Sequence, residues 1–165
     1  MIKKTIKSCM AAVIMAAVSS MFMAVTADAA EPVEVPEEIR EISEELGQAY
    51  NICPELIQAV CWRESRFKAD AENGGCVGIM QVAPKWHRDR MEKLGVTDIL
   101  DPRQNMTVAV DYLSELVKDE EDMEEVLMRY HGESRINERL EAGEMSSYVE
   151  SILTLSAELE RQNGK

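Results

Sequence analysis

The sequence is poor in aromatic residues and in positive charge. Aromatic side chains make up 5% of the 165 residues, and 18 Lys and Arg stand against 31 Asp and Glu, a net charge of -13. A chain this acidic repels phosphate backbones instead of releasing their counterions, so we expect no nucleic-acid partner. Apolar residues at 45% and charged residues at 30% are close to the globular average, which excludes collagen, coiled coils and wholesale disorder. The length suits one domain.

Histidine and cysteine are also scarce. The two histidines, His87 and His131, lack the paired spacing of a zinc motif, so we expect neither a metal nor a cofactor. Cys53 and Cys61 would lie roughly 12 Å apart on one helix, beyond the roughly 7 Å limit for a disulfide. A bridge from Cys76 to either of them and a set of free thiols both stay open.

The N-terminal segment has the pattern of an export signal. Three lysines precede an apolar run over 9–25, and Ala27-Asp28-Ala29 offers small residues for a signal peptidase. We therefore expect a signal peptide over 1–29, a short Pro-containing tether over 30–36 and one domain over 37–165, with an uncleaved membrane anchor as the alternative to cleavage. Without residues 1–29 the net charge becomes -15.

Helical periodicity dominates the rest of the chain. Apolar residues at helical spacing predict a helix from Glu37 to near Gly47, a second over 54–64, a third over 84–94, and further helices over 102–117, 123–130 and 148–159. The glycine-rich stretch 68–83 suits a loop or a short hairpin instead. The sequence therefore predicts a mainly α fold with a loop or β-hairpin after the second helix.

One carboxylate lies on an apolar helix face. The stripe formed by Ile57, Val60 and Cys61 on the second helix continues to Glu64, which directs this side chain toward the interior. An apolar surround and the helix C-terminus both favour the protonated carboxyl, the form that general acid catalysis of glycosidic cleavage requires. A salt bridge from Glu64 to Arg63 or Arg66 is the structural alternative, and spacing alone does not decide between them.

The residues around Glu64 carry a resemblance to a known family. Glu64-Ser65-Arg66-Phe67 and the glycine-rich turn that leads into Gly78-Ile79-Met80-Gln81 closely resemble the signature of the soluble lytic transglycosylases. Asp101-Pro102-x-x-Asn105 and Tyr112-Leu113-x-x-Leu116 are similar to two further family motifs. The chain departs from the family at Tyr130-His131-Gly132, where Tyr-Asn-x-Gly is usual, and at Cys76, where a small residue is usual.

The resemblance implies a lysozyme-like helical fold and a mechanism. Such enzymes cleave the MurNAc-GlcNAc β-1,4 bond of peptidoglycan without water and leave 1,6-anhydromuramoyl ends. Carried over, it makes Glu64 the catalytic acid and then base, and Ser65, Gly78, Gln81 and Tyr130 substrate-binding residues, with the Tyr130 hydroxyl orienting the carboxyl. Trp86, as an aromatic sugar platform, and His131 are further candidate contacts.

Two alternatives and several expectations accompany this interpretation. A goose-type lysozyme-like hydrolase would activate water with Asp70 or Glu72, which we otherwise assign to the loop surface. A catalytically idle glycan-binding module of an envelope-spanning apparatus is the second alternative. We expect an exported monomer in the periplasm, the cell wall or outside the cell, or membrane-anchored if the signal is retained, with peptidoglycan strands and cell-envelope machinery as partners.

Overall fold

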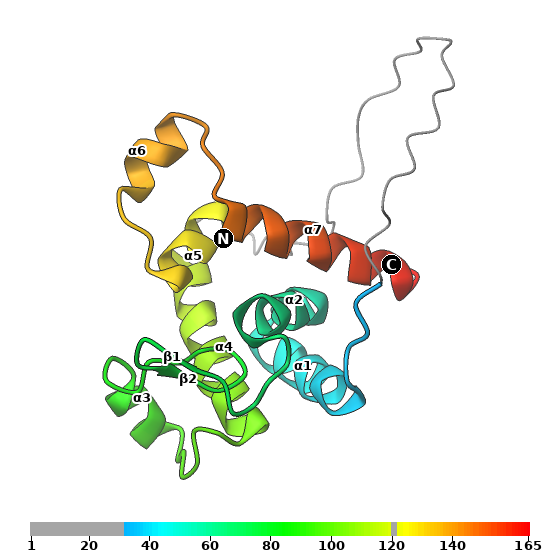
Figure 1. Ribbon diagram of the computed structural model, residues 1–165, viewed down its shortest axis with the longest axis vertical. Helices are drawn as coiled ribbons and strands as arrows, with labels where there is room; N and C mark the ends of the chain where they lie inside the picture. The colour runs from blue at the N-terminus through cyan, green and yellow to red at the C-terminus, as the bar shows by residue number, and fades with distance from the viewer. Residues whose placement is uncertain (1–31, 120–121) are drawn as a thin grey trace, which may run out of the picture. The chain divides into compact units, whose positions relative to one another are not determined.

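The computed structural model describes residues 32–119 and 122–165, and Glu34–Lys165 form one compact unit. In order, the described elements are α1 (Glu37–Tyr50), α2 (Pro54–Ser65), β1 (Glu72–Asn73), β2 (Cys76–Val77), α3 (Arg88–Lys93), α4 (Pro102–Asp119), α5 (Met123–His131), α6 (Ile136–Glu141) and α7 (Ser147–Gln162). The predicted mainly α fold with a short hairpin after the second helix is confirmed (Figure 1). The expected signal over 1–29 lies outside the described residues, and none of the described helices has the length and apolarity that crossing a membrane requires.

Helix α2 is the centre of the domain. It packs against α7 on one side and α1 on the other, while α4 packs against α1 and α5 (Figure 1). The predicted stripe residues Ile57, Val60 and Cys61 are fully buried, and so is Ala59 beside them. A helix that is apolar on several faces belongs in a core. The last turn of α2, which carries Glu64, is therefore held from two sides.

Helix α1 ends three residues later than predicted, at Tyr50. Gly47 is not a stop signal, because the chain turns only at Asn51, which has φ 57° and caps the helix. A Cβ on Gly47 would lie 2.7 Å from the Ile52 carbonyl oxygen and 2.9 Å from Pro54 Cγ. The glycine is therefore needed for the close approach of α1 to the start of α2.

One other prediction about the helices is wrong, and one helix was not predicted. The third helix does not start at Pro84, since residues 84–87 form a turn and α3 covers only Arg88–Lys93. Helix α6 was not predicted, because none of its six residues is buried and no apolar stripe marks it. The helices beginning at Pro102, Met123 and Ser147 agree with prediction; Asp122 and Ser146 cap the last two, and the Asp101 carboxylate accepts a bond from the Gln104 amide beside the start of α4.

Candidate active site

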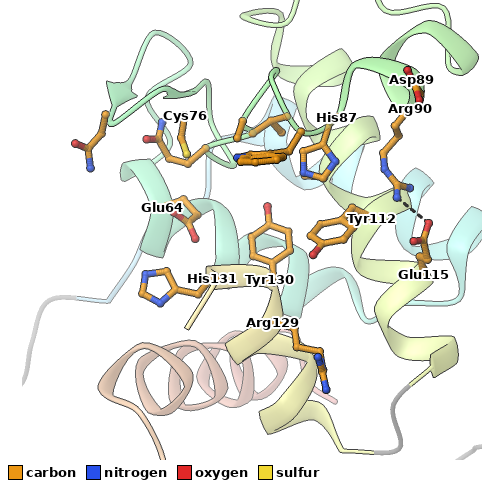
Figure 2. Close-up of a pocket in the computed structure, with 17 residues that line it drawn as sticks. Glu64, Cys76, His87, Asp89, Arg90, Tyr112, Glu115, Arg129, Tyr130 and His131 are labelled. Carbon is orange, nitrogen blue, oxygen red and sulfur yellow. Dashed lines mark hydrogen bonds and ion pairs between the residues drawn. The ribbon is translucent and has the colours of Figure 1, made fainter. Parts of the chain in front are cut away.

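A cavity of about 740 Å³ opens beside the last turn of α2. Its walls come from α2, the hairpin and the segment after it, α3, α4 and α5 (Figure 2). Of the predicted site residues, Glu64, Gln81, Trp86, Tyr130 and His131 line this cavity, whereas Ser65 and Gly78 do not. Five positions spread over 68 residues of sequence therefore converge on one concave surface, as a ligand site requires.

Glu64 is half-buried in the cavity wall and forms no ion pair within the described part of the chain. Burial raises its pKa above the usual value, although the hydrogen bond from Tyr148 and the nearby His131 and Arg63 act in the opposite direction. The alternative salt bridges are not formed: the Arg63 guanidinium lies 5.4 Å from the Tyr148 ring centroid and that of Arg66 lies 4.4 Å from the Trp62 centroid. Glu64 is thus a partly desolvated carboxyl whose protonated form is favoured.

The partner of Glu64 is a residue that sequence reasoning assigned to the core. The Tyr148 hydroxyl, on the first turn of α7, donates to Glu64 Oε1 at 2.5 Å across 84 residues of sequence. The Tyr148 ring is 3% exposed and is stacked on His131 at 3.9 Å between centroids, with the rings 2° from parallel. A buried tyrosine needs a hydrogen-bond partner for its hydroxyl, and this requirement was the signal in the sequence that could have pointed to a polar role for Tyr148. Periodicity alone made Tyr148 one more member of an apolar stripe.

Tyr130 lies half-buried between Glu64 and Tyr112 (Figure 2). Its hydroxyl donates to the Met80 carbonyl oxygen at 2.9 Å, so the predicted bond from Tyr130 to the Glu64 carboxyl is not what the structure shows. Burial and the charge of Glu64 raise the pKa of Tyr130 well above its ordinary value. Tyr130 therefore remains a neutral donor that ties α5 to the segment after the hairpin.

Asn105 holds the hairpin and the segment after it in place. Its side chain is fully buried, accepts from the Met80 amide at 2.9 Å, and donates to the carbonyls of Val77 at 2.9 Å and Ile99 at 3.0 Å. Gly78 has φ 80°, and a Cβ there would lie 2.1 Å from Asn105 Nδ2. A glycine is therefore required at position 78 for the close approach of the backbone to this amide.

Ser65 and Gln81 also form hydrogen bonds that hold the hairpin and the segment after it. The Ser65 hydroxyl is buried and donates to the Ile79 carbonyl oxygen at 2.8 Å, while it accepts from the Lys68 amide at 3.1 Å. Gln81 Nε2 donates to the carbonyls of Ala71 at 3.0 Å and Gly78 at 2.9 Å. Ser65 therefore positions the wall of the cavity, and Gln81 combines that task with a place in the lining.

The rest of the cavity lining is largely aromatic and charged. Trp86 is 77% exposed, and His87 packs on Tyr112 with 4.8 Å between ring centroids. Arg90 pairs with Asp111 and with Glu115. Asp89 and Glu115 lie at the opposite end of the cavity from Glu64 (Figure 2). An exposed indole beside a cleft offers a stacking face for the apolar side of a sugar ring.

Cys53, Cys61 and Cys76 are free thiols in the structure, so neither of the open Cys76 pairings is formed. Burial raises the pKa of Cys61 and of Cys76, the latter in the cavity lining, which keeps both thiols protonated. Across 32–119 and 122–165, no three His, Cys, Asp or Glu side chains gather as a metal site would need.

A carboxyl on the last turn of a central helix, facing a cleft that a short hairpin walls on one side, defines a lysozyme-like domain. The sequence model of the Transglycosylase SLT domain family matches residues 41–147, well over half of the chain, and the chain belongs to this family. The predicted family is thereby confirmed.

Individual relatives agree with this assignment. The chain is 33% identical over 84 residues to a transglycosylase of Enterobacteria phage PRD1, covering 50% of this chain and 30% of that protein. It is 33% identical over 87 residues to membrane-bound lytic murein transglycosylase F of Desulfosudis oleivorans, covering 52% of this chain and 18% of that protein. The chain thus spans less than a third of the length of either relative.

A solved structure shares the fold. The lytic transglycosylase Slt of Pseudomonas aeruginosa, crystallised as an inactive Glu-to-Gln mutant, superposes with a TM-score of 0.67 at 18% identity. The alignment covers 79% of this chain and 25% of the Slt chain. The predicted lysozyme-like helical architecture is therefore confirmed over most of the described residues.

Proposed function

We propose that this protein is a peptidoglycan lytic transglycosylase that cleaves the MurNAc-GlcNAc β-1,4 bond and leaves 1,6-anhydromuramoyl ends. The observation that carries the proposal is Glu64: a half-buried carboxyl with a raised pKa, held by Tyr148, in the wall of a 740 Å³ cavity. Membership of the SLT family and the similarity to two transglycosylases support it.

In the proposed mechanism Glu64 acts twice. As an acid it gives its proton to the glycosidic oxygen, and the C1–O bond breaks while the sugar's acetamido group stabilises the positive charge. As a carboxylate it then takes the proton of the sugar's own 6-hydroxyl, whose oxygen forms the new bond to C1. Glu64 ends protonated and no water is consumed. The Tyr148 hydroxyl stabilises the carboxylate between the two steps because it donates to Oε1.

The positions of the other carboxylates favour this mechanism over hydrolysis. A glycosidase needs a second carboxylate roughly 5 to 9.5 Å from the acid. Asp70 and Glu72 are exposed and do not line the cavity, which supports their assignment to the loop surface. Asp89 and Glu115 line its opposite end, and Glu115 is paired with Arg90 (Figure 2).

The test is mass spectrometry of the products released from peptidoglycan by the purified chain from residue 30 onward. We expect muropeptides that are lighter by one water than the hydrated products of a hydrolase. Their rate of release should fall by about 10³-fold or more in Glu64→Gln. Glu72→Gln is the matched control, since it makes the same change on an exposed carboxylate. Hydrated reducing ends that depend on Asp70, Glu72 or Asp89 would establish a hydrolase. Glycan capture without any release would establish the idle binding module.

We also propose that the protein is exported to the envelope by residues 1–29, acts there as a monomer, and serves cell-envelope machinery that needs local openings in the wall. The N-terminal charge and apolar pattern supports export. N-terminal sequencing of the chain recovered from outside the cytoplasm should start near residue 30. An N-terminus at Met1 in the membrane fraction would instead establish the anchored form.

A further inference from the structure

A second cavity, of about 280 Å³, lies between α2 and α7. We call it the α2–α7 groove. Arg63, Arg66 and Trp62 from the end of α2 line one side, and Ser147 and Ser151 from the start of α7 line the other. No carboxylate is among its lining residues. The groove is therefore a cationic hollow on a chain whose net charge is -13.

The two arginines of the groove differ from most others in this protein. Six of the ten arginines have a carboxylate within 4.0 Å, which an excess of acidic residues makes the ordinary outcome. Arg63 and Arg66 are exposed and have no such partner in the described part of the chain. Their guanidinium groups lie over the rings of Tyr148 and Trp62, so these contacts orient them without neutralising their charge.

The backbone conformation at Arg66 also supports a specific role for its side chain. Arg66 caps α2 in the left-handed conformation with φ 57°, a position where glycine is the residue without steric cost. The next residue, Phe67, also has a positive φ of 63°, and its ring packs on Trp62 at 5.4 Å. The chain thus accepts backbone strain and places a guanidinium over an indole at the rim of the groove.

We propose that the α2–α7 groove binds a carboxylate of the peptide that peptidoglycan strands carry on their muramic acid. This inference rests on the proposed function, because that function brings the glycan to Glu64, which directly follows Arg63 in the sequence. Each guanidinium can bind a carboxylate through two parallel hydrogen bonds. Ser147 adds a hydroxyl at the same groove.

The groove and Glu64 are physically connected through Tyr148. The Tyr148 hydroxyl donates to Glu64, and Arg63 lies 5.4 Å from the Tyr148 ring centroid. The positive charge of Arg63 is one of the influences that lower the pKa of Glu64. A carboxylate bound to Arg63 would oppose this influence and favour the protonated acid. Peptide-bearing strands would then be both better bound and better cleaved than denuded strands.

Binding can be measured without catalysis, because Trp62 lies in the groove. In a Trp86→Phe background Trp62 is the sole tryptophan, and its fluorescence reports the groove. The probe is the dipeptide L-Ala-γ-D-Glu, with its fully amidated form and inorganic phosphate as comparisons. We expect saturable quenching by the dipeptide, weakened about fivefold by Arg63→Gln or Arg66→Gln and about 20-fold by both. Arg161→Gln, an exposed arginine elsewhere on α7, is the matched control and should change nothing.

Either the absence of saturable quenching or equal quenching by the amidated dipeptide would overturn the proposal. Binding of inorganic phosphate as tight as or tighter than that of the dipeptide would also overturn it, because the groove would then be a general anion site. Urea unfolding of each variant checks that the domain is intact. The catalytic arm compares KM on peptide-bearing and denuded strands, and in the double variant these two KM values should become equal. If digestion fails for every protein while the dipeptide still binds, the proposed function is wrong and the groove assignment stands. If digestion succeeds and the dipeptide does not bind, the groove assignment alone is wrong.

Discussion

Replacing Tyr148 by phenylalanine removes one oxygen atom at the centre of the proposed mechanism. The ring stays, so its stacking on His131 and the packing of α7 are preserved. What is lost is the donor to Glu64 Oε1. A hydrogen bond to a charged acceptor contributes about 1.5 to 3 kcal/mol. This bond strengthens as Glu64 gives up its proton, so most of its energy belongs to the transition state. We therefore expect kcat to fall by about ten- to hundredfold.

The pH profile gives a second, independent readout. Since the Tyr148 hydrogen bond lowers the pKa of Glu64, its removal raises that pKa. The limb on which activity is lost with rising pH, through deprotonation of the acid, should move to higher pH in Tyr148→Phe. Tyr130→Phe is the matched control, because the Tyr130 hydroxyl binds the Met80 carbonyl and not the acid, and it should lower stability without moving the limb. An unchanged kcat with an unmoved limb in Tyr148→Phe would refute the reasoning.

Three further predictions concern stability and binding. Burial raises the pKa of Glu55, but hydrogen bonds from Lys165, Asn163 and Cys53 lower it to about 2. The ionised Glu55 therefore stabilises the folded state by about 2 kcal/mol above its pKa in the unfolded chain, and this stabilisation is lost as the pH falls from about 5 to 2. Glu55→Gln should make the free energy of unfolding less dependent on pH in this range. Asn105→Ala leaves one buried and two partly buried backbone groups without their side-chain partner and should lower the free energy of unfolding in urea by about 3 kcal/mol; an unchanged unfolding midpoint would contradict this network. Trp86→Ala should leave stability within about 0.5 kcal/mol but raise KM, and an unchanged KM would remove Trp86 from the substrate site.

Helical periodicity singled out Glu64, and the family-like motifs around it made it the candidate acid. Glu64 continues the stripe of Ile57, Val60 and Cys61, and a carboxylate on such a face is anomalous wherever the helix lies. The family-like motifs predicted three further residues of the cavity lining, Gln81, Tyr130 and His131. A motif can do this because it keeps in a fixed order along the chain residues that meet in space. Local spacing and motif order therefore predicted the fold and much of the candidate site.

Contacts between elements that are distant in the chain could not be predicted from the sequence. Nothing near Tyr148 indicates that its hydroxyl meets a residue 84 positions earlier, since the meeting depends on how α7 packs on α2. At Ser65 and Gly78, where the motif implied contact with ligand, the structure shows contacts within the protein. Their side chain and Cβ position face Ile79 and Asn105, so the motif there preserves the shape of the wall.

The bond between Tyr148 and Glu64 has a consequence for the synthesis of the protein. Glu64 leaves the ribosome 84 residues ahead of its donor, which at about 5 to 20 residues per second is a delay of roughly 4 to 17 s. During this interval the nascent chain already contains Glu64 but not the helix whose tyrosine binds it. In the proposed mechanism Glu64 therefore acquires its working geometry only when α7 has been made and has docked on α2.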